Sequence, residues 1–347
     1  MAGGMAQTGM VLALSTLSGK APYGLPSDFM ALMSTVPTAT AMGTEVTAPQ
    51  MTNYGRKALP GASWGASTGG QATYNALADF LASTGGSGTT VVGYEIWDAQ
   101  TGGTRIWWGT LTSTPIATGT DVTFPAGAIT VTIPILAAGN GYSTAYANRL
   151  VDHFTGRTAF GAAPTLNAAL TTAASTAAAL GTELGYTGYA RTVMPVASLN
   201  AAAAVPASTV SAASNTAPIS ITTTAPHGLV TGDIVTVTGV VGNTAANVVG
   251  TAITVTSPTT FTLNGTTGNG AYTSGGTVTP NAVNVASNAQ LNFPQATGAG
   301  TANVIGWAYM DSAGTPALIC AGTVTSIAIA ANTTPDFPAG TSFLRLT

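Results

Sequence analysis

The feature that most restricts the fold of this 347-residue chain is an internal duplication. Six blocks of sequence occur twice in the same order, and together they span nearly the whole length of each half. Ordered self-similarity of this kind indicates repeated structural units. The sequence therefore predicts two copies of one domain. The clearest pairs are AMGTEV (41–46) with ALGTEL (179–184), NYGRKALP (53–60) with GYARTVMP (188–195), and VVGYEIWDAQTGG (91–103) with VIGWAYMDSAG (304–314).

The spacing between the blocks shows where the two copies differ. The second copy is longer, and its extra length runs from about 217 to 280. We therefore expect residues 1–137 to form the first domain. Residues 138–216 and 281–347 are expected to form a discontinuous second domain, interrupted by an inserted module at 217–280.

The residue patterns of each copy predict a mainly all-β fold. Residues 91–111 read as a hairpin, because two apolar strands flank an Asp- and Gly-rich turn. Residues 145–156 read as a short leading helix that Gly156 can end in the left-handed conformation. We expect two tandem antiparallel β-sandwich domains, each with a short leading helix. The apolar face of the second helix is made of Tyr146, Leu150, Val151 and Phe154.

The module at 217–280 has only strand patterns. Short runs rich in Thr, Val and Ile are separated by turns of Gly, Pro and Asn, as in ISITTT (219–224) and DIVTVTGVV (233–241). About sixty residues of this kind suit a small β-barrel-like module.

Charge is scarce, because Asp, Glu, Lys and Arg make up 5% of the residues and the formal net charge is −3. A free monomer with so few charges is poorly protected against self-association, so we expect a subunit of a larger assembly. The eight basic residues are scattered, which argues against a nucleic-acid partner. No apolar run is long enough to span a membrane. The single Cys320 excludes an intramolecular disulfide framework and a Cys-rich zinc site.

No arrangement of residues indicates catalysis, a metal or a cofactor. GASWG (61–65) matches the nucleophile-elbow pattern, but Pro60 precedes it and no helix is expected after it. The two histidines lie in different modules, and His153 is expected on a solvated helix face beside Asp152. The acidic residues are spread thinly, without a local pair for sugar hydrolysis. We expect no enzymatic activity.

Two acid–base pairs occupy corresponding positions in the two copies: Glu45 with Arg56, and Glu183 with Arg191. A repeated structural ion pair is the preferred interpretation, and ligand binding is the alternative.

Three tryptophans, Trp64, Trp107 and Trp108, are candidate contacts for a neighbouring subunit or a glycan, but core packing is the preferred interpretation for most of the tryptophans. Side chains alternate along a strand, so one of the adjacent Trp107 and Trp108 should face the core and the other should face outward. In the inserted module, His227 and Asp233 are expected to fix a turn by hydrogen bonding.

The repeated blocks resemble the domain of minor tail and tail-fibre proteins of tailed bacteriophages. The resemblance is carried by RLVDHFTGRTAFGAAPTLNAALTTA (149–173), GTEV (43–46), NYGRKAL (53–59), FPAG (124–127) and VGYEIWDAQTGGTRIWWGTL (92–111). The segment at 226–278 is similar to a recurring phage virion module that is commonly likened to a small β-barrel domain of ubiquitin-activating enzymes. That likeness is one of fold only.

The resemblance implies a non-enzymatic structural protein of the virion. A tail-tip or tail-fibre subunit that takes part in assembly and host-surface contact is the first choice. A capsid decoration protein or head fibre is the alternative, and a glycan-binding or glycan-degrading tail protein is a weaker one. The implied partners are other virion proteins, further copies of the chain, for which a trimer suits a fibre, and a host surface glycan or receptor.

Overall fold

The computed structural model describes residues 3–136, 141–298, 302–312, 316–341 and 343–347. The chain forms two compact units. The first unit comprises Met1–Ala202 and Val285–Leu344, and the second comprises Ala203–Asn284 and Arg345–Thr347. Within the first unit, we call 3–136 the first half, and 141–202 with 285–344 the second half. The fold is mainly β, as predicted.

The first half is built on a five-stranded antiparallel sheet in the order β1-β7-β6-β2-β3. The predicted hairpin is confirmed as β6 and β7, which pair around the turn that follows Trp97. The five strands are β1 (Gly3–Met5), β2 (Asp28–Met33), β3 (Lys57–Leu59), β6 (Thr89–Trp97) and β7 (Arg105–Ile116).

The second half is built on a sheet of the same size and order, β10-β23-β22-β11-β12. Its strands are β10 (Gly141–Tyr142), β11 (Leu166–Thr171), β12 (Thr192–Val193), β22 (Val304–Asp311) and β23 (Ala317–Ile327). Aligning the strand registers defines matched positions in the two halves. Among the matched positions are Asp28 with Leu166, Glu95 with Ala308, Arg105 with Leu318, and Trp108 with Ala321.

Short two-stranded sheets accompany each main sheet. Phe124 ends β8, and Phe80 directly follows β5. The two rings pack edge-on against each other, and Phe124 also packs against Tyr94 of the main sheet. In the second half, Phe337 ends β24 and Phe293 directly follows β21, and their rings also pack edge-on. The small sheets pair β4 (Gln71–Thr73) with β9 (Thr130–Thr132), β5 (Ala78–Asp79) with β8 (Thr123–Phe124), and β21 (Leu291–Asn292) with β24 (Asp336–Phe337).

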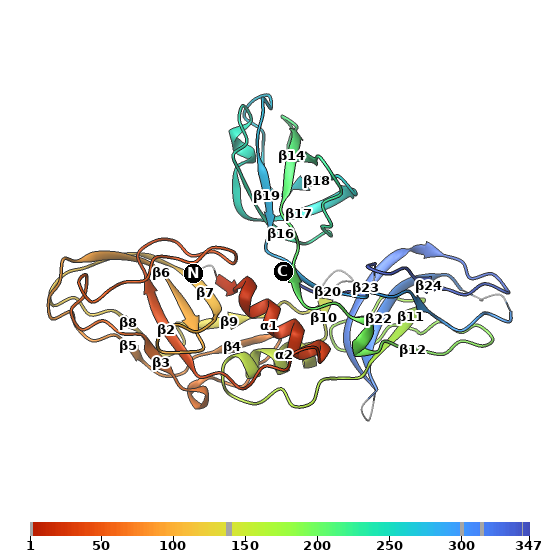
Figure 1. Cartoon of the computed structure of the whole chain (residues 1–347), viewed down its shortest axis with the longest axis horizontal. Coiled ribbons are helices and arrows are strands. Elements are labelled where there is room, and N and C mark those ends of the chain that lie inside the picture. Colours follow the sequence, from red (N-terminus) through yellow and green to blue (C-terminus); the bar gives the residue numbers. More distant parts are fainter. Residues whose placement is uncertain (1–2, 137–140, 299–301, 313–315, 342) are drawn as a thin grey trace. The chain divides into compact units, whose positions relative to one another are not determined.

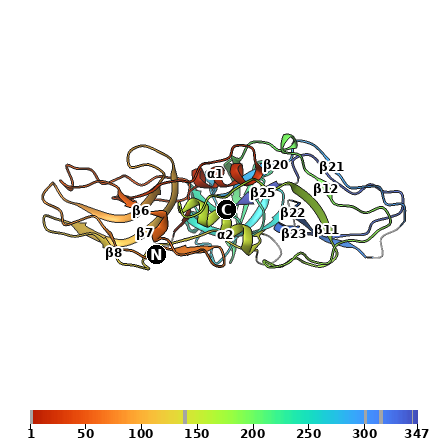
Figure 2. The same cartoon turned by 90° about the horizontal axis from the view of Figure 1, so that it is seen from below.

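The described residues include two α-helices, α1 (Gln7–Ser18) and α2 (Thr144–Phe154), which lie between the two main sheets (Figures 1 and 2). The predicted apolar face of α2 is buried. Ser143 caps α2 by accepting a hydrogen bond from the Tyr146 N–H, and Gly156 follows with a positive φ of 66°. Neither helix is long and apolar enough to cross a membrane, within the ranges that the structure describes.

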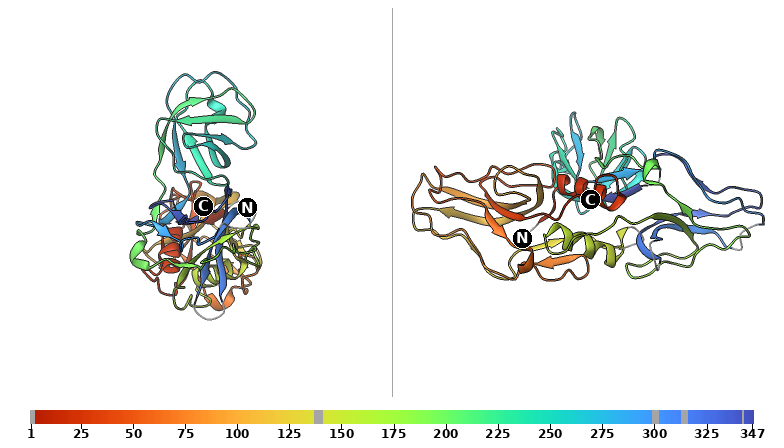
Figure 3. Two further views of the ribbon diagram at one scale, coloured as in Figure 1. Left: turned by 90° about the vertical axis from the view of Figure 1, so that its right-hand side faces the viewer. Right: turned by 60° about the horizontal axis from the view of Figure 1, so that its bottom comes forward.

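The second unit is a closed six-stranded barrel in the order β14-β15-β18-β17-β16-β19 (Figure 3). Its core is aliphatic apart from Phe261, which is fully buried. The first strand begins at Ser208, before the expected start of the module at 217. The strands are β14 (Ser208–Ala213), β15 (Ile219–Thr223), β16 (Ile234–Thr238), β17 (Val248–Ser257), β18 (Thr260–Leu263) and β19 (Thr277–Pro280).

The remaining strands form a three-stranded sheet. Single turns of 3-10 helix occur in the loops. The strands are β13 (Ala203–Ala204), β20 (Val283–Ala286) and β25 (Phe343–Leu346). The 3-10 helices are Gly61–Ser63, Val196–Ser198 and Thr244–Ala246.

Candidate functional site

Glu45 and Arg56 form a two-pronged ion pair in the first half. Arg56 Nε lies 3.0 Å from Glu45 Oε1, and Nη2 lies 2.8 Å from Oε2. The Tyr54 hydroxyl also donates to Glu45 Oε1 at 2.8 Å, while it accepts the Leu32 N–H at 3.2 Å. Glu45 is thereby tied to β2 through Tyr54, and its carboxylate is engaged by two side chains of its own domain.

Arg56 also holds the turn between β6 and β7. Its Nη1 donates to the carbonyls of Ala99 (3.0 Å) and Gly102 (2.7 Å). The guanidinium lies over the Trp97 ring, 4.3 Å from the ring centroid. A planar, multidentate cation suits this combination of acceptors and ring face better than an ammonium does. These contacts favour the structural interpretation of the pair.

The second half contains the same arrangement at Glu183 and Arg191. Their Nε–Oε1 and Nη2–Oε2 distances are 3.0 and 2.8 Å, and the Tyr189 hydroxyl donates to Glu183 at 2.9 Å. Burial raises the pKa of Glu183, but the bonds from Arg191 and Tyr189 and the Arg191 charge outweigh it, so the pKa is lowered. The arginine of this pair is the more exposed one, because the Arg191 side chain is 29% exposed and that of Arg56 is 8% exposed, while the two glutamates are exposed to a similar extent.

Of the three candidate tryptophans, Trp64 and Trp107 are buried and do not offer a surface contact for a partner. Trp107 is fully buried, and its indole N–H donates to the Phe154 carbonyl at 2.8 Å, at the end of α2. Trp64 is 3% exposed and packs edge-on against Tyr74. Both residues belong to the core of the first unit. The sequence pattern shows that they are hydrophobic, but it cannot show which elements cover them.

Trp108 lies on the other face of β7, where it pairs with Gly4 of β1 and Glu95 of β6. It is partly buried, while its neighbour Trp107 is fully buried. Of the three tryptophans, Trp108 therefore remains a candidate contact for a partner.

His227 and Asp233 lie in one buried corner of the barrel unit. His227 Nδ1 accepts the Leu229 N–H at 2.9 Å, and Asp233 Oδ2 accepts the Val230 N–H at 2.9 Å. Burial lowers the pKa of His227, and bonds to two backbone groups and the Asp233 charge only partly offset this. A neutral imidazole is the form that can accept the Leu229 N–H.

Arg345 is the charged partner of Asp233, and sequence reasoning missed it. The two side chains form an ion pair in which Arg345 Nε lies 2.8 Å from Asp233 Oδ1. Arg345 also donates to the Gly228 carbonyl and to Asn284 Oδ1. No local pattern links residues 112 positions apart, so this pair could be found only in the fold.

His153 was expected on a solvated face of its helix, and this expectation is wrong. The side chain is 2% exposed, and its Nδ1 accepts the Phe160 N–H at 3.1 Å. The rings of Tyr23 and Phe160 approach it edge-on. The segment after α2 and the segment after α1 cover this side of the helix, and burial lowers the pKa of His153.

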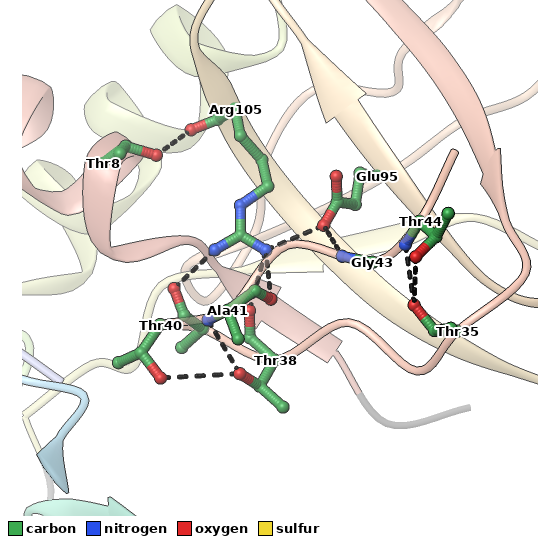
Figure 4. A network of polar contacts seen from close by, with 10 residues as sticks. Thr8, Thr35, Thr38, Thr40, Ala41, Gly43, Thr44, Glu95 and Arg105 are labelled. Carbon is green, nitrogen blue, oxygen red and sulfur yellow. Dashed lines mark hydrogen bonds and ion pairs between the residues drawn. The ribbon is translucent and has the colours of Figure 1, made fainter.

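Arg105 and Glu95 form a buried ion pair that sequence reasoning did not assign (Figure 4). Their closest atoms, Nη1 and Oε1, are 2.8 Å apart, and Glu95 Oε1 also accepts the Gly43 N–H at 3.0 Å. The only available signal was the presence of one acid and one base in the two apolar strands of the predicted hairpin. Arg105 makes three further bonds of 2.8 Å, to the carbonyls of Thr38, Ala39 and Ala41.

Two neighbouring acidic residues of the first half, Asp28 and Asp98, influence each other. This side chain is 3% exposed, and neither carboxylate oxygen has a hydrogen-bond partner among the described residues. Burial, and then the charge of Asp98, raise the pKa of Asp28 well above its usual range. Asp98 accepts the Tyr23 hydroxyl and the Thr104 N–H. Asp28 is therefore suited to remain protonated inside the domain.

The described residues offer no assembled catalytic centre. Ser63 of the nucleophile-like motif lies in a 3-10 helix, whereas both histidines are buried and bonded elsewhere. No three His, Cys, Asp or Glu side chains come together where they could hold a metal ion, as far as the structure describes the chain.

Comparison with known families gives two matches. Residues 11–132 match the family described as Podophage GP4 fiber I protein gp80, and residues 214–281 match the ubiquitin-activating enzyme E1 FCCH domain. The first match covers most of the first half, and the second covers most of the barrel. A search of curated proteins gave no match. The gp80 match likens the first half of this chain to a phage fibre protein.

Proposed function

We propose that this protein is a tail-fibre or tail-tip subunit that assembles with copies of itself and with other virion proteins and contacts the host surface. The observation that carries the proposal is the match of residues 11–132 to a phage fibre protein, because this region is a folded half with its own sheet, helix and core.

The charge distribution supports an assembly subunit. Asp233 and Arg345 are the only Asp, Glu, Lys or Arg residues in the barrel unit, and they are paired with each other. Their side chains are 0% and 9% exposed. The barrel therefore presents a nearly uncharged surface, which lacks the charge repulsion that keeps free monomers apart.

Location in the particle is tested by copy number and labelling. Quantitative mass spectrometry of purified virions should give a handful of copies, and gold-labelled antibodies against the barrel should mark the tail. Hundreds of copies with labels spread over the head would instead establish the alternative, a capsid decoration protein or head fibre.

Self-assembly is tested by analytical ultracentrifugation of the full chain. We expect a defined oligomer, with a trimer as the form that suits a fibre. A stable monomer at micromolar concentration would contradict a self-assembling subunit.

A glycan-degrading role is the weaker alternative, and the geometry does not favour it. Hydrolysis needs two accessible carboxyl groups on either side of the sugar bond, about 5–10 Å apart. Asp28 is buried next to Asp98 and cannot reach a sugar, whereas Asp79 and the exposed Asp121 are neighbouring carboxyl groups. This second pair is therefore the one to test. Release of reducing ends from host polysaccharide, abolished by Asp79→Asn, would establish the enzyme instead.

A further inference from the structure

The two halves of the first unit hold the same loop in the same way. In the first half, the Gln7 N–H donates to the Ala39 carbonyl, and the Thr38 N–H donates to Ala41. In the second half, the Thr144 N–H donates to the Ala177 carbonyl, and the Thr176 N–H donates to the Ala179 carbonyl. The loop at 176–181 is therefore the structural counterpart of the loop at 38–43.

What these loops enclose differs between the halves. In the first half, the Arg105 guanidinium fills the space beside the loop and binds three of its carbonyls (Figure 4). At the matched positions of the second half, Leu318 replaces Arg105 and Ala308 replaces Glu95. Both replacements shorten the side chain and remove its charge.

A cavity of about 510 Å³ lies at this place in the second half. Its wall is formed by the loop residues Ala177, Ala178 and Ala179, by the first turn of α2, and by Met310 and Leu318 of the sheet. No charged side chain lines it. Leu318, which stands at the position of Arg105, thus borders an open space where the first half holds a guanidinium.

The carbonyl groups that bind the guanidinium in the first half have counterparts beside this cavity. They belong to Ala177 and Ala179, which line the cavity, and to Thr176, which precedes them in the loop. Each of the three carbonyls accepts one backbone N–H. A carbonyl oxygen has two lone pairs, so each can accept a second bond, as the Ala39 and Ala41 carbonyls do from Arg105.

We propose that this cavity is a socket for an arginine side chain of a partner polypeptide. The guanidinium would bind the carbonyls of Thr176, Ala177 and Ala179, in the way that the Arg105 guanidinium binds their counterparts. Its aliphatic stem would pack on Met310 and Leu318, since arginine buries its stem along apolar surface. The inference goes beyond the proposed function, because it holds or fails regardless of where the protein lies in the virion.

Arginine fits this site better than the other cationic side chain. A guanidinium presents five donors in a fixed plane and can serve several carbonyls at once, whereas an ammonium is a compact point charge. Binding of a single arginine is expected to be weak, because Ala308 supplies no carboxylate and the N-terminus of α2 at the rim carries partial positive charge. A partner would strengthen it through neighbouring contacts.

Alanine methyl groups line the cavity, so methyl NMR of the full chain labelled at alanine reports on it directly. We would titrate N-acetyl-arginine methylamide, with the citrulline and leucine analogues as controls. Saturable shifts of the Ala177, Ala178 and Ala179 methyls with the arginine compound only are expected. Equal shifts with the leucine compound would show a general apolar pocket, and an absence of shifts up to tens of millimolar would also overturn the proposal.

Two variants complete the test. Ala178→Leu partly fills the cavity from an exposed loop position, and should weaken arginine binding at least fivefold. Thr40→Leu is the matched control, because Arg105 already fills the corresponding space in the first half, and its binding should be unchanged. Leu318→Arg combined with Ala308→Glu should abolish binding by restoring the internal ion pair. Unchanged binding in both filling variants would place the ligand elsewhere and overturn the socket.

Discussion

At the residue scale, the buried charged and polar groups of the first half set the clearest expectations. Asp28 and the Arg105–Glu95 pair occupy positions that hold Leu166, Leu318 and Ala308 in the second half. The same sheet therefore folds with and without these groups. Substitution toward the residues of the second half separates what each group contributes to stability from what the sheet requires.

Asp28→Leu should stabilise the protein at neutral pH. A carboxyl whose pKa is higher in the folded state favours folding fully below its unfolded pKa of about 3.9, and this contribution is lost as the pH rises through the folded pKa. The variant should gain about 1–3 kcal/mol at pH 7, the usual penalty of a buried unsatisfied polar group. It should also show a flatter dependence of unfolding free energy on pH.

Chemical denaturation between pH 4 and 8 measures this effect. Asp336→Asn, at an exposed position, is the control and should leave the curve unchanged. A loss of stability in Asp28→Leu at pH 7 would show that the carboxylate has a stabilising partner.

The Arg105–Glu95 pair should behave as a coupled unit. Glu95→Ala alone leaves a buried cation and should cost about 3–5 kcal/mol of unfolding free energy. Glu95→Ala combined with Arg105→Leu reproduces the residues of the second half and should cost clearly less than the sum of the single changes. A double-mutant cycle by urea denaturation measures the coupling, and strictly additive effects would contradict it.

At the scale of secondary-structure elements, local patterns predicted helix α2 and the β6–β7 hairpin correctly. Strand alternation explains why Trp107 is more buried than Trp108. The same patterns failed for His153, because a pattern identifies one apolar face and cannot show that a distant loop covers the opposite one. Tyr23, which lies 130 positions before His153 in the chain, is such a cover.

The hairpin turn after β6 should depend on Arg56. Arg56→Lys loses the contacts with two turn carbonyls and the stacking on Trp97, and should cost about 1–2 kcal/mol. Arg191→Lys, where the arginine is more exposed, should cost less than about 1 kcal/mol. Thermal unfolding of both variants compares them directly, and equal losses would argue against a special role of the turn.

At the scale of the whole molecule, the barrel is closed by its own hydrogen bonds and has its own aliphatic core. The chain enters and leaves it at neighbouring points, because the Val205 N–H donates to the Ala282 carbonyl at 2.9 Å. A short linker can therefore span the gap that removal of the barrel would leave.

Deletion of 206–281 with a Gly–Ser linker should leave the first unit folded. The variant should also carry Arg345→Gln, since the deletion removes Asp233 and would leave its partner's charge uncompensated. We expect the methyl NMR shifts of α1, α2 and the two main sheets to be retained. Collapse of the second half alone would show that the barrel is needed for its folding, and would contradict an inserted module.

The sequence by itself determined the mainly β fold class, the ordered duplicate blocks, helix α2, the β6–β7 hairpin and the low charge. These features depend on residue types and on spacing within single segments, so they can be read locally. The tertiary structure decided which polar groups are buried and which groups are their partners. Arg345 with Asp233, Arg105 with the loop at 38–43, and the cavity beside the loop at 176–181 depend on which distant segments meet. Burial and hydrogen-bond partners arise only when the chain packs, and no spacing along the sequence encodes them.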